Sequence, residues 1–176
     1  MSKIWNIDNV LIMLKLVGGF MEVVINDLEE LRKYIKVSKE KRTINLKFED
    51  VVFNCALPSK NNFNYFQDED IEDYTLVLRA NNIIFKYYAE WDNIYAKNVE
   101  SEDTIICRVL NVIGKTIGGY IAADMLVGVT ITANTLVVKK ICCRQLKSAY
   151  LSIDKKEYNY IQASSINNIG VRYGRD

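Results

Sequence analysis

Between Ile121 and Leu151 a large aliphatic residue stands at every fifth position of the chain. The residue two places after each of them is usually small, as at Ala123, Gly128 and Ala133. This period matches neither the repeat of an α-helix, about 3.6 residues, nor the alternation of a plain strand. It predicts a mainly β fold of the β-solenoid (β-helix) type, in which short strands point two side chains inward and the next residues turn a corner.

The same unit extends towards the N-terminus with a longer spacing. Ile83, Ile94 and Ile105 are eleven residues apart, whereas the later modules repeat every ten residues. After a polar interruption, the five-residue spacing of large aliphatic residues resumes at Ile161. We therefore predict a solenoid over residues 74–176, in which two modules close one four-sided coil of about twenty residues.

Residues 1–73 predict a small N-terminal α/β cap. Charged residues and a glycine pair interrupt an early apolar stretch, so it predicts a short helix and then a strand at Met21–Ile25, and neither a membrane span nor a signal peptide. Asn26 and Glu29 have the spacing of a capping box, which predicts a helix at Leu28–Ile35.

The rest of the predicted cap contains strands and an acidic loop. Apolar alternation over Arg42–Leu57 predicts two strands, or one strand with a bulge. Pro58–Asp73 predicts a solvated loop. A calcium site is the alternative there, but a calcium loop needs a glycine at its sharp turn and this segment contains none.

Charge and residue types narrow the possible chemistry. The 23 basic and 22 acidic residues leave a net charge of +1, so no overall field attracts nucleic acid or anionic lipid. Histidine is absent, which excludes histidine-dependent triads and histidine-ligated zinc. No phosphate-binding loop, nucleophile elbow or zinc motif is present, so we predict no catalytic residue, no cofactor and no metal site.

The cysteines predict a reducing environment. The chain has four of them, Cys55, Cys107, Cys142 and Cys143, and no C-x-x-C motif. We expect buried small side chains without disulfides, as in a cytoplasmic protein.

Three units, LRANNI at residues 78–83, IYAKNV at 94–99 and ITANTL at 131–136, resemble the I-x-A-x-x-I repeats of uncharacterised bacterial and phage β-solenoid proteins. They also resemble the bactofilins, bacterial cytoskeletal proteins that polymerise through stacked β-helices. The resemblance covers about residues 78–171. It implies a structural protein that self-associates.

The outward residues of the eleven-residue modules are candidates for an interface. They are Ile84, Tyr95, Ile106 and Ile117. In a four-sided coil Ile84 and Ile106 share one outer face, and Tyr95 and Ile117 share the opposite one. Exposed apolar columns need a cover. We expect the helix at 28–35 to cover one column, and a second copy of the chain or another protein to cover the other.

A local basic cluster consists of Lys139, Lys140, Arg144 and Lys147. We expect it to be solvated, with contact to an acidic partner or nucleic acid as the alternative.

The function expected overall is that of a non-catalytic structural or protein-interaction solenoid that forms homo-oligomers. The alternatives are a nucleic-acid-associated or inhibitory phage-type solenoid and a carbohydrate-active enzyme, which needs clustered outward carboxylates. Among the assigned outward positions Glu100 is the one carboxylate.

Overall fold

The fold of the computed structural model is mainly β. The structure describes residues 22–58, 73–153, 161–162 and 165–168. The elements in chain order are β1 (Glu22–Ile25), α2 (Leu28–Arg32), β2 (Lys36–Ser38), β3 (Thr43–Lys47), β4 (Asp50–Phe53), β5 (Thr75–Phe85), β6 (Ala89–Ile153), β7 (Ile161–Gln162) and β8 (Ser165–Asn168). The expected first helix and most of the expected acidic loop lie outside the described residues.

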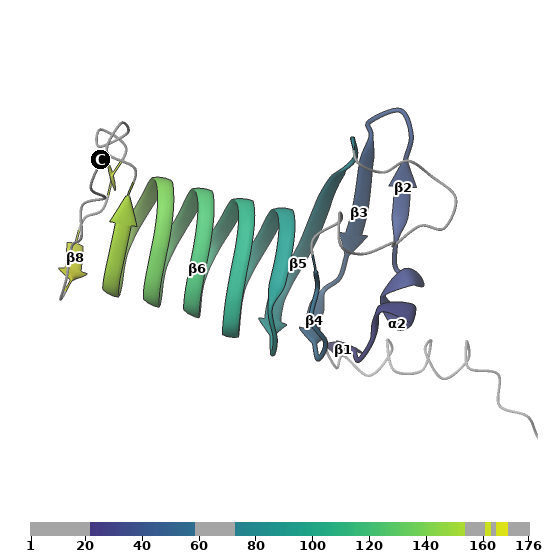
Figure 1. Ribbon diagram of the computed structural model, residues 1–176, viewed down its shortest axis with the longest axis horizontal. Coiled ribbons are helices and arrows are strands. Elements are labelled where there is room, and N and C mark those ends of the chain that lie inside the picture. Colours follow the sequence, from purple (N-terminus) through teal and green to yellow (C-terminus); the bar gives the residue numbers. More distant parts are fainter. Residues whose placement is uncertain (1–21, 59–72, 154–160, 163–164, 169–176) are drawn as a thin grey trace, which may run out of the picture.

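Parallel pairing joins residues sixteen positions apart where β5 meets β6. Asn82, for example, lies opposite Asn98. Further along β6 the hydrogen-bonded side chains of Thr130 and Gln145 are fifteen positions apart. In Figure 1 the ribbon of β6 turns back on itself repeatedly, and its passes lie side by side along the long axis. The predicted spacing of about twenty residues is therefore wrong where β5 meets β6. Where β6 meets β7 and β8, paired residues such as Ile141 and Ile161 are twenty positions apart.

The inward positions of the five-residue count form the core. Every large residue of this count from Ile121 to Leu151 is buried, with at most 3% of its surface exposed. The smaller partners Ala123, Ala133 and Cys143 are also buried. Because the same positions are filled in successive passes, the interior of β6 is one continuous apolar column.

The N-terminal strands extend the same sheet. β3 and β4 pair in parallel with successive parts of β5, so that Leu46 lies opposite Leu78. β1 adds a parallel strand to β4, and β2 adds an antiparallel strand to β3. Of the two alternatives predicted for Arg42–Leu57, two strands or one strand with a bulge, the structure has two strands. The sheet runs across the predicted domain boundary between residues 73 and 74, and that boundary stays a prediction.

Aromatic rings fill the N-terminal part of the core. The Tyr34 and Phe48 ring centroids are 5.0 Å apart, and Phe48 meets Phe53 edge-on at 6.0 Å. Phe53 in turn stacks on Phe85 at 5.3 Å, and both are almost completely buried. Large rings in contact bury much apolar surface. They join the N-terminal strands to β5 through one packed core.

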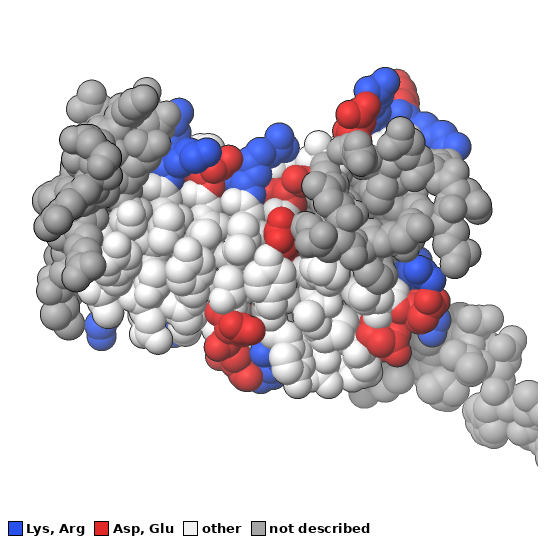
Figure 2. Space-filling model, viewed as in Figure 1, with Lys and Arg blue, Asp and Glu red and all other residues white. Residues whose placement is uncertain are grey.

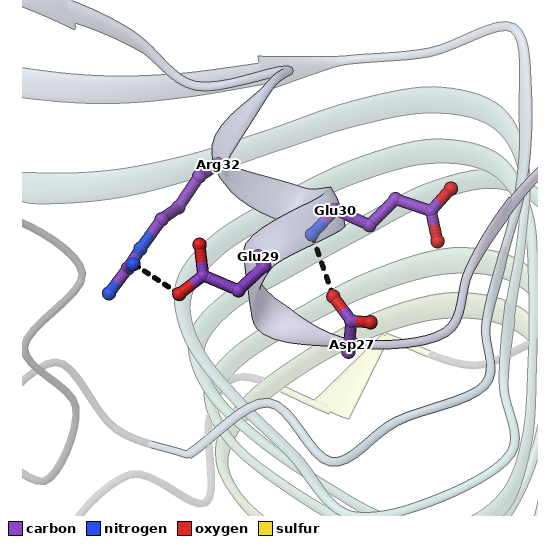
Figure 3. Close-up of polar contacts among 4 residues, drawn as sticks. All are labelled: Asp27, Glu29, Glu30 and Arg32. Atoms are coloured by element: carbon purple, nitrogen blue, oxygen red, sulfur yellow. Dashed lines mark hydrogen bonds and ion pairs between the residues drawn. The ribbon is translucent and has the colours of Figure 1, made fainter.

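The N-cap of α2 is Asp27 and not Asn26 as predicted. The Asp27 carboxylate accepts a hydrogen bond from the backbone N–H of Glu30 at 2.7 Å (Figure 3). The Glu30 carboxylate accepts one from the backbone N–H of Asn26 at 3.0 Å, and Arg32 pairs with Glu29 on the same helix. A carboxylate suits the positive end of the helix better than an amide does, so the cap lies one residue later.

The helix is also shorter than predicted. It ends at Arg32, because residues 36–38 pair with β3 as the strand β2. Its one buried side chain, Leu31, joins the core, and the main contact of α2 is with β1. The expected cover of an outward isoleucine column by this helix is therefore wrong.

Candidate functional site

A half-open groove lies over the junction of β5 and β6. Its lining residues are Asn82, Ile83, Ile84, Asn98, Val99, Glu100, Lys115 and Ile117. Ile83 and Val99 are buried core residues, so the sheet itself forms the floor. The other lining residues stand on that floor or at the corner beside it. We call this feature the Ile84–Ile117 groove.

Two of the four predicted interface residues meet in this groove. Ile84 and Ile117 are both half-buried, and Glu100, which lies opposite Ile84 in the sheet, is exposed. The predicted grouping of Ile84 with Ile106, and of Tyr95 with Ile117, is wrong. Since a pass takes about sixteen residues, the chain returns to the Ile84 side at Glu100 and then near Ile117.

The other two predicted residues lie elsewhere. Tyr95 is opposite Arg79, whose guanidinium carbon is 4.9 Å from the centroid of the tyrosine ring. This cation–π contact covers part of the ring. Ile106 is half-buried and does not line the groove. The predicted set of four is thus a pair of residues in one groove and two residues outside it.

A ladder of side-chain amides runs along the corner that borders the groove. The Asn82 amide donates to Asp50 Oδ1 at 2.6 Å, and the Asn98 amide donates to Asn82 Oδ1 at 2.8 Å. Asn98 Oδ1 then accepts the backbone N–H of Lys115 at 3.0 Å. A side chain at Gly114 would bring its Cβ to 2.6 Å from this oxygen, so the corner requires a glycine. This ladder was not predicted from the sequence, and its one signal there is the sixteen-residue spacing of Asn82 and Asn98.

The groove carries one acidic and one basic side chain. Glu100 and Lys115 are both exposed, and neither side chain forms a hydrogen bond or ion pair with another described residue. The nearby Lys86 pairs with Glu102 instead. That hydrogen bond is the main cause of the raised pKa of Lys86, to which the charge of Glu100 contributes less.

The predicted basic cluster is partly neutralised. Lys139 Nζ lies 2.7 Å from Asp124 Oδ1, and both side chains are about half exposed. Lys140 is half-buried, whereas Arg144 and Lys147 are exposed. In Figure 2 basic and acidic side chains are interspersed along one edge of β6, and the broad surface below that edge carries few charges. Contact of the cluster with nucleic acid stays a prediction.

The cysteines differ in exposure. Cys107 and Cys143 are buried, Cys55 is half-buried, and none of the four is in a disulfide. Burial raises the pKa of the Cys107 thiol to about 12, with a smaller contribution from Asp124. Cys142 is exposed, so the prediction of burial is wrong for it. Alternation along the strand turns Cys142 outward between two inward neighbours.

Two further features are absent from the described part of the chain. No group of three or more Cys, Asp or Glu side chains is placed there to hold a metal ion. No helix in those ranges has the length and apolar content needed to cross a bilayer.

Comparisons of the whole chain with protein-family models, curated proteins and solved structures gave no match. The resemblance to bactofilins therefore stays a prediction.

Proposed function

We propose that the chain is a three-sided β-solenoid that serves as a non-catalytic structural or protein-interaction protein and self-associates. The sixteen-residue parallel register between β5 and β6 supports the solenoid, because two five-residue faces and one six-residue face account for it. The apolar column inside β6 supports it too. Each pass then buries its apolar side chains against the next, which is how repeat proteins gain stability.

The observation that carries the interaction role is the Ile84–Ile117 groove. Two isoleucines occupy outward positions on a regular sheet, where polar side chains are the usual choice. Apolar groups in such positions favour contact with another surface over contact with water. The repeats that resemble bactofilins support the same role, since those proteins assemble from stacked parallel strands. The four free cysteines fit the reducing conditions of a bacterial cytoplasm or of a phage-infected cell.

Size-exclusion chromatography with light scattering tests self-association. We expect the wild-type mass to exceed that of one chain, and a filament would appear by electron microscopy at higher concentration. Ile117→Asp should lower the mass to that of a monomer, because a carboxylate in a dehydrated contact costs several kcal/mol. Ile106→Asp makes the same change outside the groove and is the matched control.

Circular dichroism must show that both variants keep the wild-type fold. A wild-type protein that stays monomeric at every concentration would contradict self-association. A mass lowered by Ile106→Asp but not by Ile117→Asp would move the contact away from the groove.

A further inference from the structure

We propose that the Ile84–Ile117 groove binds the same groove of a second copy, related by a two-fold axis, with Glu100 of each copy facing Lys115 of the other. This inference rests on the proposed self-association and names its partner and its contact. A two-fold contact uses the same patch on both copies, so the patch must be complementary to itself.

The apolar part of the groove meets this requirement. Ile84 and Ile117 flank one carboxylate on a floor formed by the sheet. When two such surfaces meet, the isoleucines of each copy are covered by those of the other. Burial of apolar side chains is the favourable term in such contacts.

The charges in the groove also meet the requirement that the patch be complementary to itself. Glu100 and Lys115 are opposite in sign and line the same groove, and neither side chain forms a hydrogen bond or ion pair with another described residue. They do not pair with each other within the chain. The rotation that brings two copies together places each charge beside its opposite, twice in one interface. Such complementarity sets the orientation of a complex and disfavours unrelated partners.

The corner that carries Lys115 is held in place before any contact forms. The backbone N–H of Lys115 donates to Asn98, and Asn98 is held by Asn82. A surface that is already ordered loses little conformational entropy when it binds. The ladder thus fixes the backbone from which the lysine extends, while the side chain stays exposed.

Charge reversal tests the pairing. Glu100→Lys and Lys115→Glu should each weaken the dimer about tenfold or more, because each places two like-charged pairs in the interface. The double variant Glu100→Lys/Lys115→Glu should regain the dimer. Mixing the two single variants should also give a dimer containing one copy of each, since every contact is then between opposite charges. Sedimentation equilibrium measures all four dissociation constants.

Glu49→Lys and Lys47→Glu make the same charge changes on exposed residues outside the groove and should leave the dimer unchanged. A double variant or a mixture that stays monomeric would overturn the Glu100–Lys115 contact. A wild-type dimer that resists both single reversals would overturn the two-fold groove and leave self-association standing. A monomeric wild type would overturn both proposals.

Discussion

At the scale of single residues, Thr116 departs from the rule that fills the core. Thr116 lies five residues before Ile121, at an inward position that a large aliphatic residue occupies in the following passes, and it is completely buried. Its hydroxyl forms no hydrogen bond with another described residue. A buried hydroxyl without a partner costs free energy that an apolar group of the same shape does not.

Thr116→Val is therefore expected to raise the free energy of unfolding by about 1 kcal/mol. Valine has the shape of threonine, keeps the methyl contacts and removes the unpaired hydroxyl. Thr116→Ala removes the methyl group as well and should lower stability, because it leaves a cavity. Urea denaturation of both variants measures the changes. A valine variant less stable than wild type would show that the hydroxyl has a partner, such as a buried water.

At the scale of elements, the corners are ordered by side chains as well as by backbone pairing. The Asp50–Asn82–Asn98 ladder links successive passes at the edge of the sheet. Arg108 makes a similar link at another corner, where its guanidinium donates to Asn93 Oδ1 at 3.3 Å. Side-chain amides both donate and accept, which allows asparagine to continue such a ladder.

Asn98→Ala should lower the free energy of unfolding by about 1–3 kcal/mol, because it leaves Asn82 and the Lys115 N–H without their partner. Asn98→Asp should not restore the loss, since a carboxylate accepts from Lys115 but cannot donate to Asn82. Asn111→Ala is the control, because the Asn111 side chain forms no hydrogen bond with a described residue. Chemical denaturation compares the three. Equal losses for Asn98→Ala and Asn111→Ala would contradict the ladder as a source of stability.

At the scale of the whole molecule, the passes of β6 stack along one axis with N-terminal strands at one end and β7 and β8 at the other (Figure 1). Passes in the middle have neighbours on both sides. A pass with neighbours on both sides loses more contacts when it opens than a strand at an end of the sheet does. Opening should therefore begin at the ends of the stack.

Hydrogen exchange followed by mass spectrometry tests this gradient. Amides in residues 94–136 should exchange most slowly, and those of β2, β7 and β8 fastest, because these short strands lie at the ends of the sheet. The Ile117→Asp variant is the control. It shows how much a local change within the stack, as opposed to opening from the ends, speeds the exchange of nearby amides. Uniform protection over all strands would show that the molecule opens in one step and would contradict the gradient.

Side-chain directions within a strand were predictable from the sequence, whereas the exact start of the helix was not. The inward positions from Ile94 to Leu151 are confirmed, because the direction of a side chain depends on its neighbours along the strand. The cap of α2 was misplaced by one residue, since Asn26 and Asp27 are both good N-caps and the Asp27 carboxylate suits the positive end of the helix better.

Local sequence was enough to predict which side chains point inward and the outward direction of Ile84, Tyr95, Ile106 and Ile117. It predicted strands within Arg42–Leu57 without distinguishing two strands from one strand with a bulge. Tertiary structure decided the rest. The length of a pass, and therefore the meeting of Ile84 with Ile117, depends on corner angles and on backbone pairing between residues about sixteen positions apart. A period of five residues does not fix how many positions separate two paired residues. Backbone hydrogen bonds between passes set that separation, and these bonds exist only in the folded chain.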